Sequence, residues 1–177
     1  MSFKFEKELY IKRILFLILI AITAVFQNTS LLPVFGNAHA WVLIPLVVSI
    51  AMNEKSVPSM AFGILAGVLW DFASEAIDGY YAIVFCVIAF TCSMLVNFVM
   101  RNNILSALLL SFVAVGAVSL LNWLLFIVFK RYGSFSYTLV NYYIPSAIYT
   151  FIFTPISYFI TFAIAKKFKT DSRAINS

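Results

Sequence analysis

Long apolar runs, separated by short polar turns, dominate this chain. Most of these runs approach the roughly 20 residues that an α-helix needs to cross the hydrocarbon core of a bilayer. Hydrophobic residues make up 63% and charged residues 11% of the 177 positions. In soluble domains about 45–50% of the residues are hydrophobic and about 25% are charged. The core of a 177-residue protein cannot bury so many hydrophobic residues. We therefore predict an all-α, polytopic integral membrane bundle surrounded by lipid.

The runs and the turn signals between them predict about six transmembrane helices in a single membrane domain that covers residues 1–177. The expected helices span about 9–26, 38–52, 57–72, 80–100, 104–129 and 137–165. The second and third are short for a full span, so we expect tilt or local thinning of the bilayer around them. No room remains for a second, soluble domain.

The distribution of basic residues predicts the orientation. With six helices, every Lys and Arg except Lys130 and Arg131 falls on the side that holds both tails. Cytoplasmic loops carry such an excess of basic residues, so both termini are expected in the cytoplasm. The net charge of +5 is then explained by membrane anchoring, and nucleic-acid binding is not expected.

The third expected helix carries a stripe of small and acidic residues that is the candidate helix-packing or partner interface. With the turn that follows, the stripe comprises Ser59, Gly63, Gly67, Asp71, Glu75 and Gly79. The first four members recur every fourth residue and therefore share one face of the helix. Glycine in this spacing lets another helix approach closely, which matters in lipid because apolar side chains alone do not drive association there.

Two interpretations of Asp71 follow from its place at the end of this helix. It is either an intramembrane carboxylate used for proton relay or ligand binding, or an interfacial residue that hydrogen-bonds a neighbouring helix or a partner. The least favoured alternative is a small membrane enzyme that uses Asp71 and Glu75. We find no motif for a phosphate loop, a zinc protease or a serine hydrolase. No catalytic, cofactor or metal site is expected, since His39 is the single histidine and the two cysteines cannot share a metal.

The later helices carry polar faces that have two readings. Serine, threonine and asparagine recur along the expected helices 80–100, 104–129 and 137–165. Such residues pack between helices and satisfy backbone groups freed by proline. The alternative is a lined binding cavity, which would need several of these faces to converge on water.

The stripe also carries a resemblance to a known family. The stretch GILAGVLWDFASEAIDGYYA at 63–82, the earlier QNTSLLPVFG at 27–36 and the later YYIPSAIYTFIFTP at 142–155 together resemble the MreD family of rod shape-determining membrane proteins. The likeness covers nearly the whole chain and rests on the order and spacing of these pieces. Glu75 is a departure, because glycine is more common in the family at that point.

The resemblance implies a non-enzymatic scaffold in the bacterial plasma membrane that supports lateral peptidoglycan synthesis and cell shape. The partners it implies are an MreC-like protein, a RodA-like glycosyltransferase and a class B penicillin-binding protein, with MreB filaments as an indirect partner. MreD-like proteins also resemble the six-helix subunits that bind the substrate in vitamin transporters. A small-molecule-binding transporter subunit is therefore the alternative function.

Overall fold

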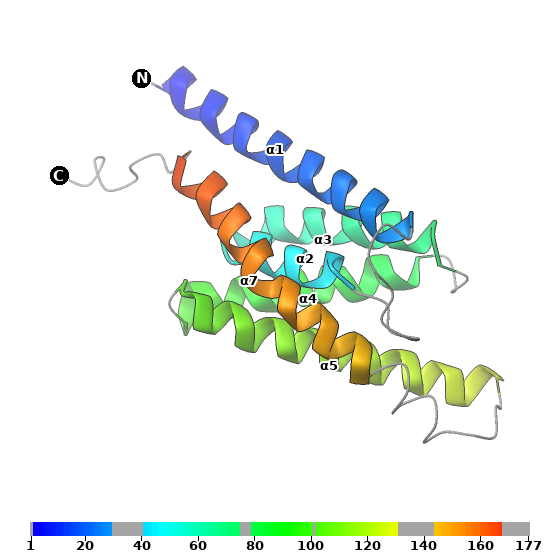
Figure 1. The fold of residues 1–177 in the computed structure, drawn as a ribbon. Helices are drawn as coiled ribbons and strands as arrows, with labels where there is room; N and C mark the ends of the chain where they lie inside the picture. The colour runs from blue at the N-terminus through cyan, green and yellow to red at the C-terminus, as the bar shows by residue number, and fades with distance from the viewer. Residues whose placement is uncertain (1, 30–40, 75–78, 101, 131–143, 168–177) are drawn as a thin grey trace.

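The computed structural model describes residues 2–29, 41–74, 79–100, 102–130 and 144–167. Within these residues it is all-helical, with six helices (Figure 1). They are α1 (Ser2–Asn28), α2 (Leu43–Ala51), α3 (Ser56–Asp71), α4 (Tyr80–Phe98), α5 (Ile104–Lys130) and α7 (Ile144–Lys167). The predicted all-α class is thus confirmed.

Among the described residues, four stretches are long and apolar enough to cross a membrane. They are Leu9–Asn28, Tyr80–Phe98, Ile104–Leu124 and Pro145–Lys167. The chain is therefore a multi-pass helical membrane protein, as its apolar runs predict. The remaining two helices, α2 and α3, are shorter, and these are the two that the sequence also marks as short for a full span.

The observed bounds differ from the expected ones mainly at α1 and α2. The first helix begins at Ser2 instead of near residue 9, because the Lys and Glu residues of the tail are good helix formers and extend the helix beyond the apolar stretch. The second begins at Leu43 and covers less than the expected 38–52. Its Pro45 lies in the first turn, where the missing N–H of proline removes no helical hydrogen bond. The expected starts at 38 and 137 fall outside the described residues.

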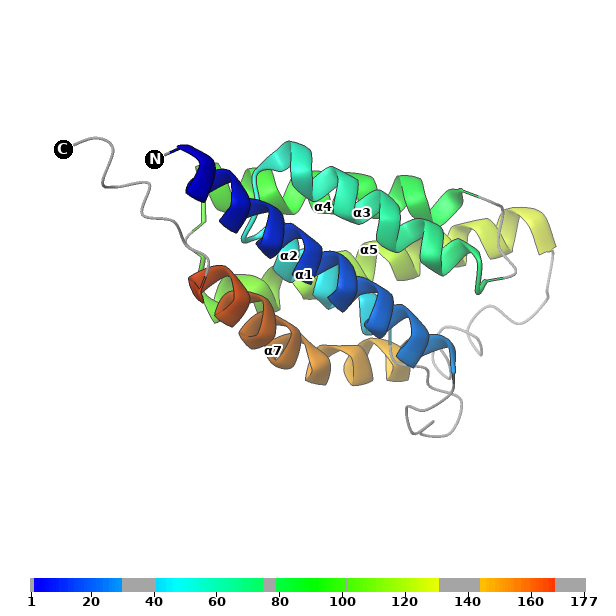
Figure 2. The ribbon, with the colours of Figure 1, turned by 90° about the horizontal axis from the view of Figure 1, so that it is seen from above.

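The short helix α2 lies at the centre of the bundle. All nine of its residues are buried, and it contacts α1, α3, α4, α5 and α7. Figures 1 and 2 show it enclosed by the longer helices from two directions. A helix that is apolar on every side belongs in such a core. Side chains of other helices hold the N-terminal end of α2 in place. Gln27 Oε1 of α1 accepts a hydrogen bond from Leu43 N, at the first residue of α2, at 3.1 Å. Thr150 Oγ1 of α7 accepts one from Trp41 N, two residues before α2, at 2.9 Å.

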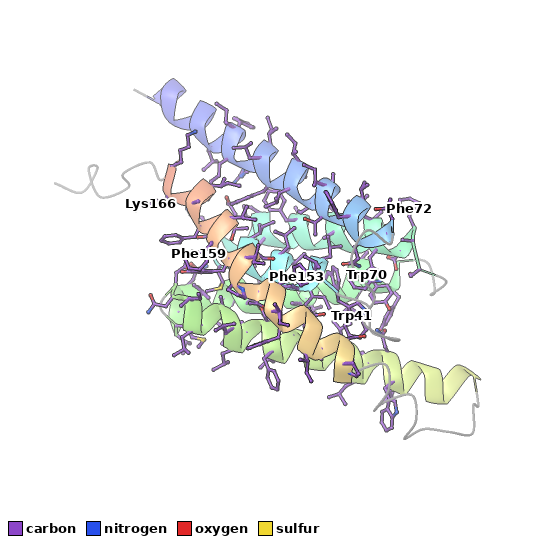
Figure 3. All side chains as sticks on the ribbon, in the orientation of Figure 1. Trp41, Trp70, Phe72, Phe153, Phe159 and Lys166 are labelled. Carbon is purple, nitrogen blue, oxygen red and sulfur yellow. The ribbon has the colours of Figure 1, made fainter. Side chains whose placement is uncertain are left out.

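The two ends of the bundle differ in chemistry. The start of α1 and the end of α7 lie at one end, which we call the termini end (Figures 1 and 2). There Lys12 Nζ lies 2.7 Å from Glu54 Oε1 and donates to Asn53 O at 2.8 Å, while Asn102 Nδ2 donates to Asn53 Oδ1 at 2.9 Å. These contacts join α1 to the α2–α3 and α4–α5 turns. Trp70 and Phe72 lie at the opposite end from Lys166 (Figure 3).

Candidate functional site: the α3–α4 interface

The small residues of the stripe face α4 of the same chain. Ser59, Gly63 and Gly67 are buried. A Cβ atom added at Gly63 would lie 2.5 Å from Phe85 O and 2.9 Å from Ala89 Cβ. Both separations are shorter than van der Waals contact. Glycine is thus required here because the two helices approach too closely for any side chain.

Gly67 lies still closer to the neighbouring helix. A Cβ added there would collide with the backbone of Tyr81 and Ala82, in the first turn of α4. One turn before Gly63, the hydroxyl of Ser59 donates to Ser56 O at 2.8 Å and lies 3.4 Å from Ala89 O. The stripe therefore runs along α4 over most of the length of α3.

The carboxylate of Asp71 caps the N-terminus of α4. Its Oδ1 accepts a hydrogen bond from Tyr81 N at 3.0 Å, and its Oδ2 accepts one from Ala82 N at 3.1 Å. The first N–H groups of a helix have no partner within that helix, and the helix dipole favours negative charge beside them. Gly79, the residue before α4, has no side chain that could serve as a cap, so α3 supplies the acceptor.

Gly79 has a conformational role in the same connection. Its φ of 84° lies in the left-handed region, which glycine adopts without steric cost. The chain can thereby leave the α3–α4 connection and enter α4 so that Tyr81 and Ala82 present their N–H groups to Asp71. Glu75, the remaining member of the stripe, lies outside the described residues.

Aromatic side chains that the sequence does not connect with this cap form a cluster around it. The rings of Trp70 and Tyr81 are 5.2 Å apart, and those of Trp70 and Phe85 are 5.4 Å apart in an edge-to-face arrangement. The hydroxyl of Tyr81 donates to Asn122 Oδ1 of α5 at 3.2 Å, with both residues buried. Tyrosines near helix ends are typical of interface belts, so the burial of Tyr81 could be recognised only once its neighbours were placed.

Three hydroxyls on the polar faces of the later helices donate to a carbonyl of their own helix. Thr150 Oγ1 donates to Ser146 O at 2.6 Å, and Thr161 Oγ1 donates to Ser157 O at 2.9 Å. Ser119 Oγ makes the same kind of bond to Val115 O at 2.8 Å. Hydroxyls that bond to a carbonyl one turn back are satisfied without a ligand. At these three positions the hydroxyl hydrogens are already used, whereas Ser111 Oγ and Thr154 Oγ1 are buried with no hydrogen-bond partner among the described residues.

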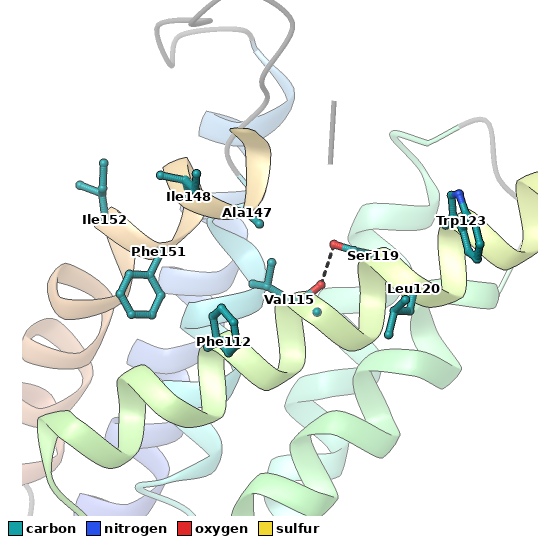
Figure 4. Close-up of a pocket in the computed structure, with 10 residues that line it drawn as sticks. Phe112, Val115, Ser119, Leu120, Trp123, Ala147, Ile148, Phe151 and Ile152 are labelled. Carbon is teal, nitrogen blue, oxygen red and sulfur yellow. Dashed lines mark hydrogen bonds between the residues drawn. The ribbon is translucent and has the colours of Figure 1, made fainter. Parts of the chain in front are cut away.

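A pocket of about 580 Å³ lies between α5 and α7 (Figure 4). Its walls include Phe112, Trp123, Phe151 and Ile152, and its floor includes Gly116. It is separate from the α3–α4 interface. Within the described part of the chain, no group of three or more His, Cys, Asp or Glu residues is placed to hold a metal ion.

The geometry changes the interpretation of the stripe. Ser59, Gly63, Gly67 and Asp71 all engage α4, so this face is already occupied within the chain and is not open to a partner helix. Of the two carboxylates in the stripe, only Asp71 lies within the described residues. Both of its oxygens accept hydrogen bonds from backbone N–H groups. Comparison with protein-family models, curated proteins and solved structures found no match.

Proposed function

We propose that this chain is a non-enzymatic scaffold subunit of the bacterial cell-elongation complex, similar to MreD. In this role it supports lateral peptidoglycan synthesis and cell shape beside an MreC-like protein, a RodA-like glycosyltransferase and a class B penicillin-binding protein. MreB filaments are the indirect partner on the cytoplasmic side. The sequence resemblance at 63–82 and the multi-pass helical architecture support this proposal.

The proposed topology has six membrane crossings in the bacterial plasma membrane, with both termini in the cytoplasm. The start of α1 and the end of α7 lie at the same end of the bundle (Figure 1), which an even number of crossings requires. Lys12 and Lys55 belong to this end, and α7 finishes there with Lys166 and Lys167. The positive-inside rule favours the cytoplasm for that end.

The observation that carries the non-enzymatic role is the engagement of Asp71. A general acid or base must reach the proton of a substrate, whereas the two oxygens of Asp71 hold the first turn of α4. A carboxylate that is used in this way stabilises a helix pair. A partner helix would instead contact the outward faces of the long helices, since the small-residue stripe is occupied by α4.

The transporter alternative rests on the polar faces of the later helices. A site for a vitamin-sized ligand uses a few precisely placed polar groups to orient the ligand. The hydroxyls of Thr150, Thr161 and Ser119 donate within their own helices, and at these three positions the bonds support helix packing, as the scaffold proposal expects.

The deciding experiment is affinity purification of the tagged chain from its native membranes, followed by mass spectrometry of the proteins that accompany it. The scaffold proposal expects the MreC-like, RodA-like and penicillin-binding partners. Recovery of an energy-coupling ATPase pair, with none of the elongation proteins, would refute the proposal and favour the transporter.

Asp71→Asn supplies a second arm of the same experiment. Asparagine keeps one carbonyl acceptor for the α4 cap but cannot act as a base. Cells that depend on this variant should keep their shape, and the same partners should co-purify with it. Loss of cell shape at a normal level of folded Asp71→Asn protein would argue for a chemical role of the carboxylate.

A further inference from the structure

The pocket between α5 and α7 opens at membrane depth. Its lining residues belong to the apolar stretches Ile104–Leu124 and Pro145–Lys167, which are both long enough to cross a bilayer. Phe112 and Phe151 meet edge to face at one side of it, with ring centroids 6.4 Å apart, and Trp123 lies at the far side (Figure 4). The hydrocarbon of the lipid is therefore the solvent that surrounds this pocket.

Gly116 leaves the floor of the pocket open. A Cβ added at this glycine would meet no atom of the described residues within 4 Å, in contrast to Gly63 and Gly67, which are in close contact with α4. Phe112 of α5 is 70% exposed and Ile148 of α7 is 64% exposed. Both side chains therefore project from the bundle surface, one from each helix that borders the pocket.

The chemistry of the lining selects an apolar occupant. Its hydroxyl at Ser119 already donates to Val115 O at 2.8 Å (Figure 4). Among the described residues the lining carries no charged side chain, and most of its side chains are aliphatic or aromatic. Buried polar groups of a ligand need hydrogen-bond partners, and this lining offers few. The part of the molecule that enters the pocket is thus hydrocarbon.

The size of the pocket indicates whether a single acyl chain or a protein partner occupies it. Ten of the described residues line it, whereas a stable protein–protein interface uses roughly 20–30 residues on each side. Its volume of about 580 Å³ falls in the range of about 300–1,000 Å³ that is usual for small-molecule sites. The number of lining residues argues against a second copy or a partner helix, the volume fits a small ligand, and the apolar lining makes that ligand an acyl chain.

We propose that the α5–α7 pocket is a specific site for one acyl chain of a membrane phospholipid, which lies over Gly116 between Phe151 and Trp123. The site fixes a lipid on the outer surface of the bundle and makes that lipid part of the surface that other membrane proteins meet. This inference does not depend on the proposed scaffold function.

The test is native mass spectrometry of the full chain extracted in a mild detergent, with the retained lipid identified by fragmentation. Wild-type protein should carry a single phospholipid. Gly116→Leu fills the floor from α5, and Ala147→Leu fills the pocket from α7, so each should lose the retained lipid. Leucine is a better helix former than glycine, and Gly116→Leu is therefore expected to fold.

Ala163→Leu is the matched control. Ala163 is an exposed residue of α7 that does not line the pocket, so this variant should retain the lipid as the wild type does. The proposal is overturned if wild-type protein retains no phospholipid, or if the filled variants and the control retain it equally. Loss of a co-purifying protein in place of a lipid would also overturn it and would assign the pocket to a partner helix.

Discussion

The close approach of α3 and α4 predicts that a single methyl group at Gly67 destabilises the protein. In Gly67→Ala the new Cβ would collide with the backbone of Tyr81 and Ala82. Carbon atoms pack at about 3.5–4.0 Å, so α4 would have to move away by about 1 Å. Backbone atoms cannot rotate aside as a flexible side chain can, and the whole first turn of α4 must shift.

The expected magnitude follows from three contributions. Overpacking costs about 1–3 kcal/mol. The hydrogen bonds from Tyr81 N and Ala82 N to Asp71, now 3.0 and 3.1 Å long, would lengthen, and a weakened cap costs about 1 kcal/mol. Alanine gains about 1 kcal/mol over glycine in helix propensity. We therefore expect a net destabilisation of about 1–3 kcal/mol.

The measurement is unfolding of the purified protein in mixed detergent micelles, compared with Gly116→Ala. The added Cβ at Gly116 meets nothing within 4 Å. In protein stripped of bound lipid, this control keeps the propensity gain without the collision and should be neutral or stabilised by up to about 1 kcal/mol. If Gly67→Ala unfolds at the same point as Gly116→Ala, α3 and α4 are not packed as described, and the steric argument fails.

Three further predictions concern polar contacts between helices. Asp71→Ala should lower the free energy of unfolding by about 1–2 kcal/mol, measured as above, and Asp71→Asn should recover part of this loss. Glu54→Gln leaves Lys12 without its counter-ion and should cost on the order of 3 kcal/mol, whereas the double variant Lys12→Met, Glu54→Leu should lie closer to wild type in a double-mutant cycle. Gln27→Ala removes the acceptor for Leu43 N and Thr150→Val the acceptor for Trp41 N, so each should cost about 1–3 kcal/mol and raise amide exchange at the N-terminal end of α2.

The helical, multi-pass character could be predicted from the sequence because the length and the apolarity of a segment decide whether it can span a bilayer. The face shared by Ser59, Gly63, Gly67 and Asp71 could also be predicted, since it follows from helical periodicity alone. Both properties depend on a single segment and not on the helices that pack against it.

The identity of the neighbour could not be predicted in the same way. Glycines spaced for close contact are compatible with a partner protein or with another helix of the same chain, and the contacts of Gly63 with Phe85 and Ala89 resolve this in favour of α4. Likewise, the sequence does not reveal that the hydroxyl of Tyr81 meets Asn122, because the two residues are 41 positions apart.

The burial of α2 has a consequence for how the protein is made. Nine residues form a helix of roughly 13.5 Å, less than half of a hydrocarbon core of about 30 Å, so α2 is too short to be inserted stably by itself. One of the two side chains that accept a backbone N–H at the N-terminal end of α2 is Thr150, which belongs to α7, 109 positions after Trp41 in the chain. The centre of the molecule is therefore completed only after α7 has been synthesised.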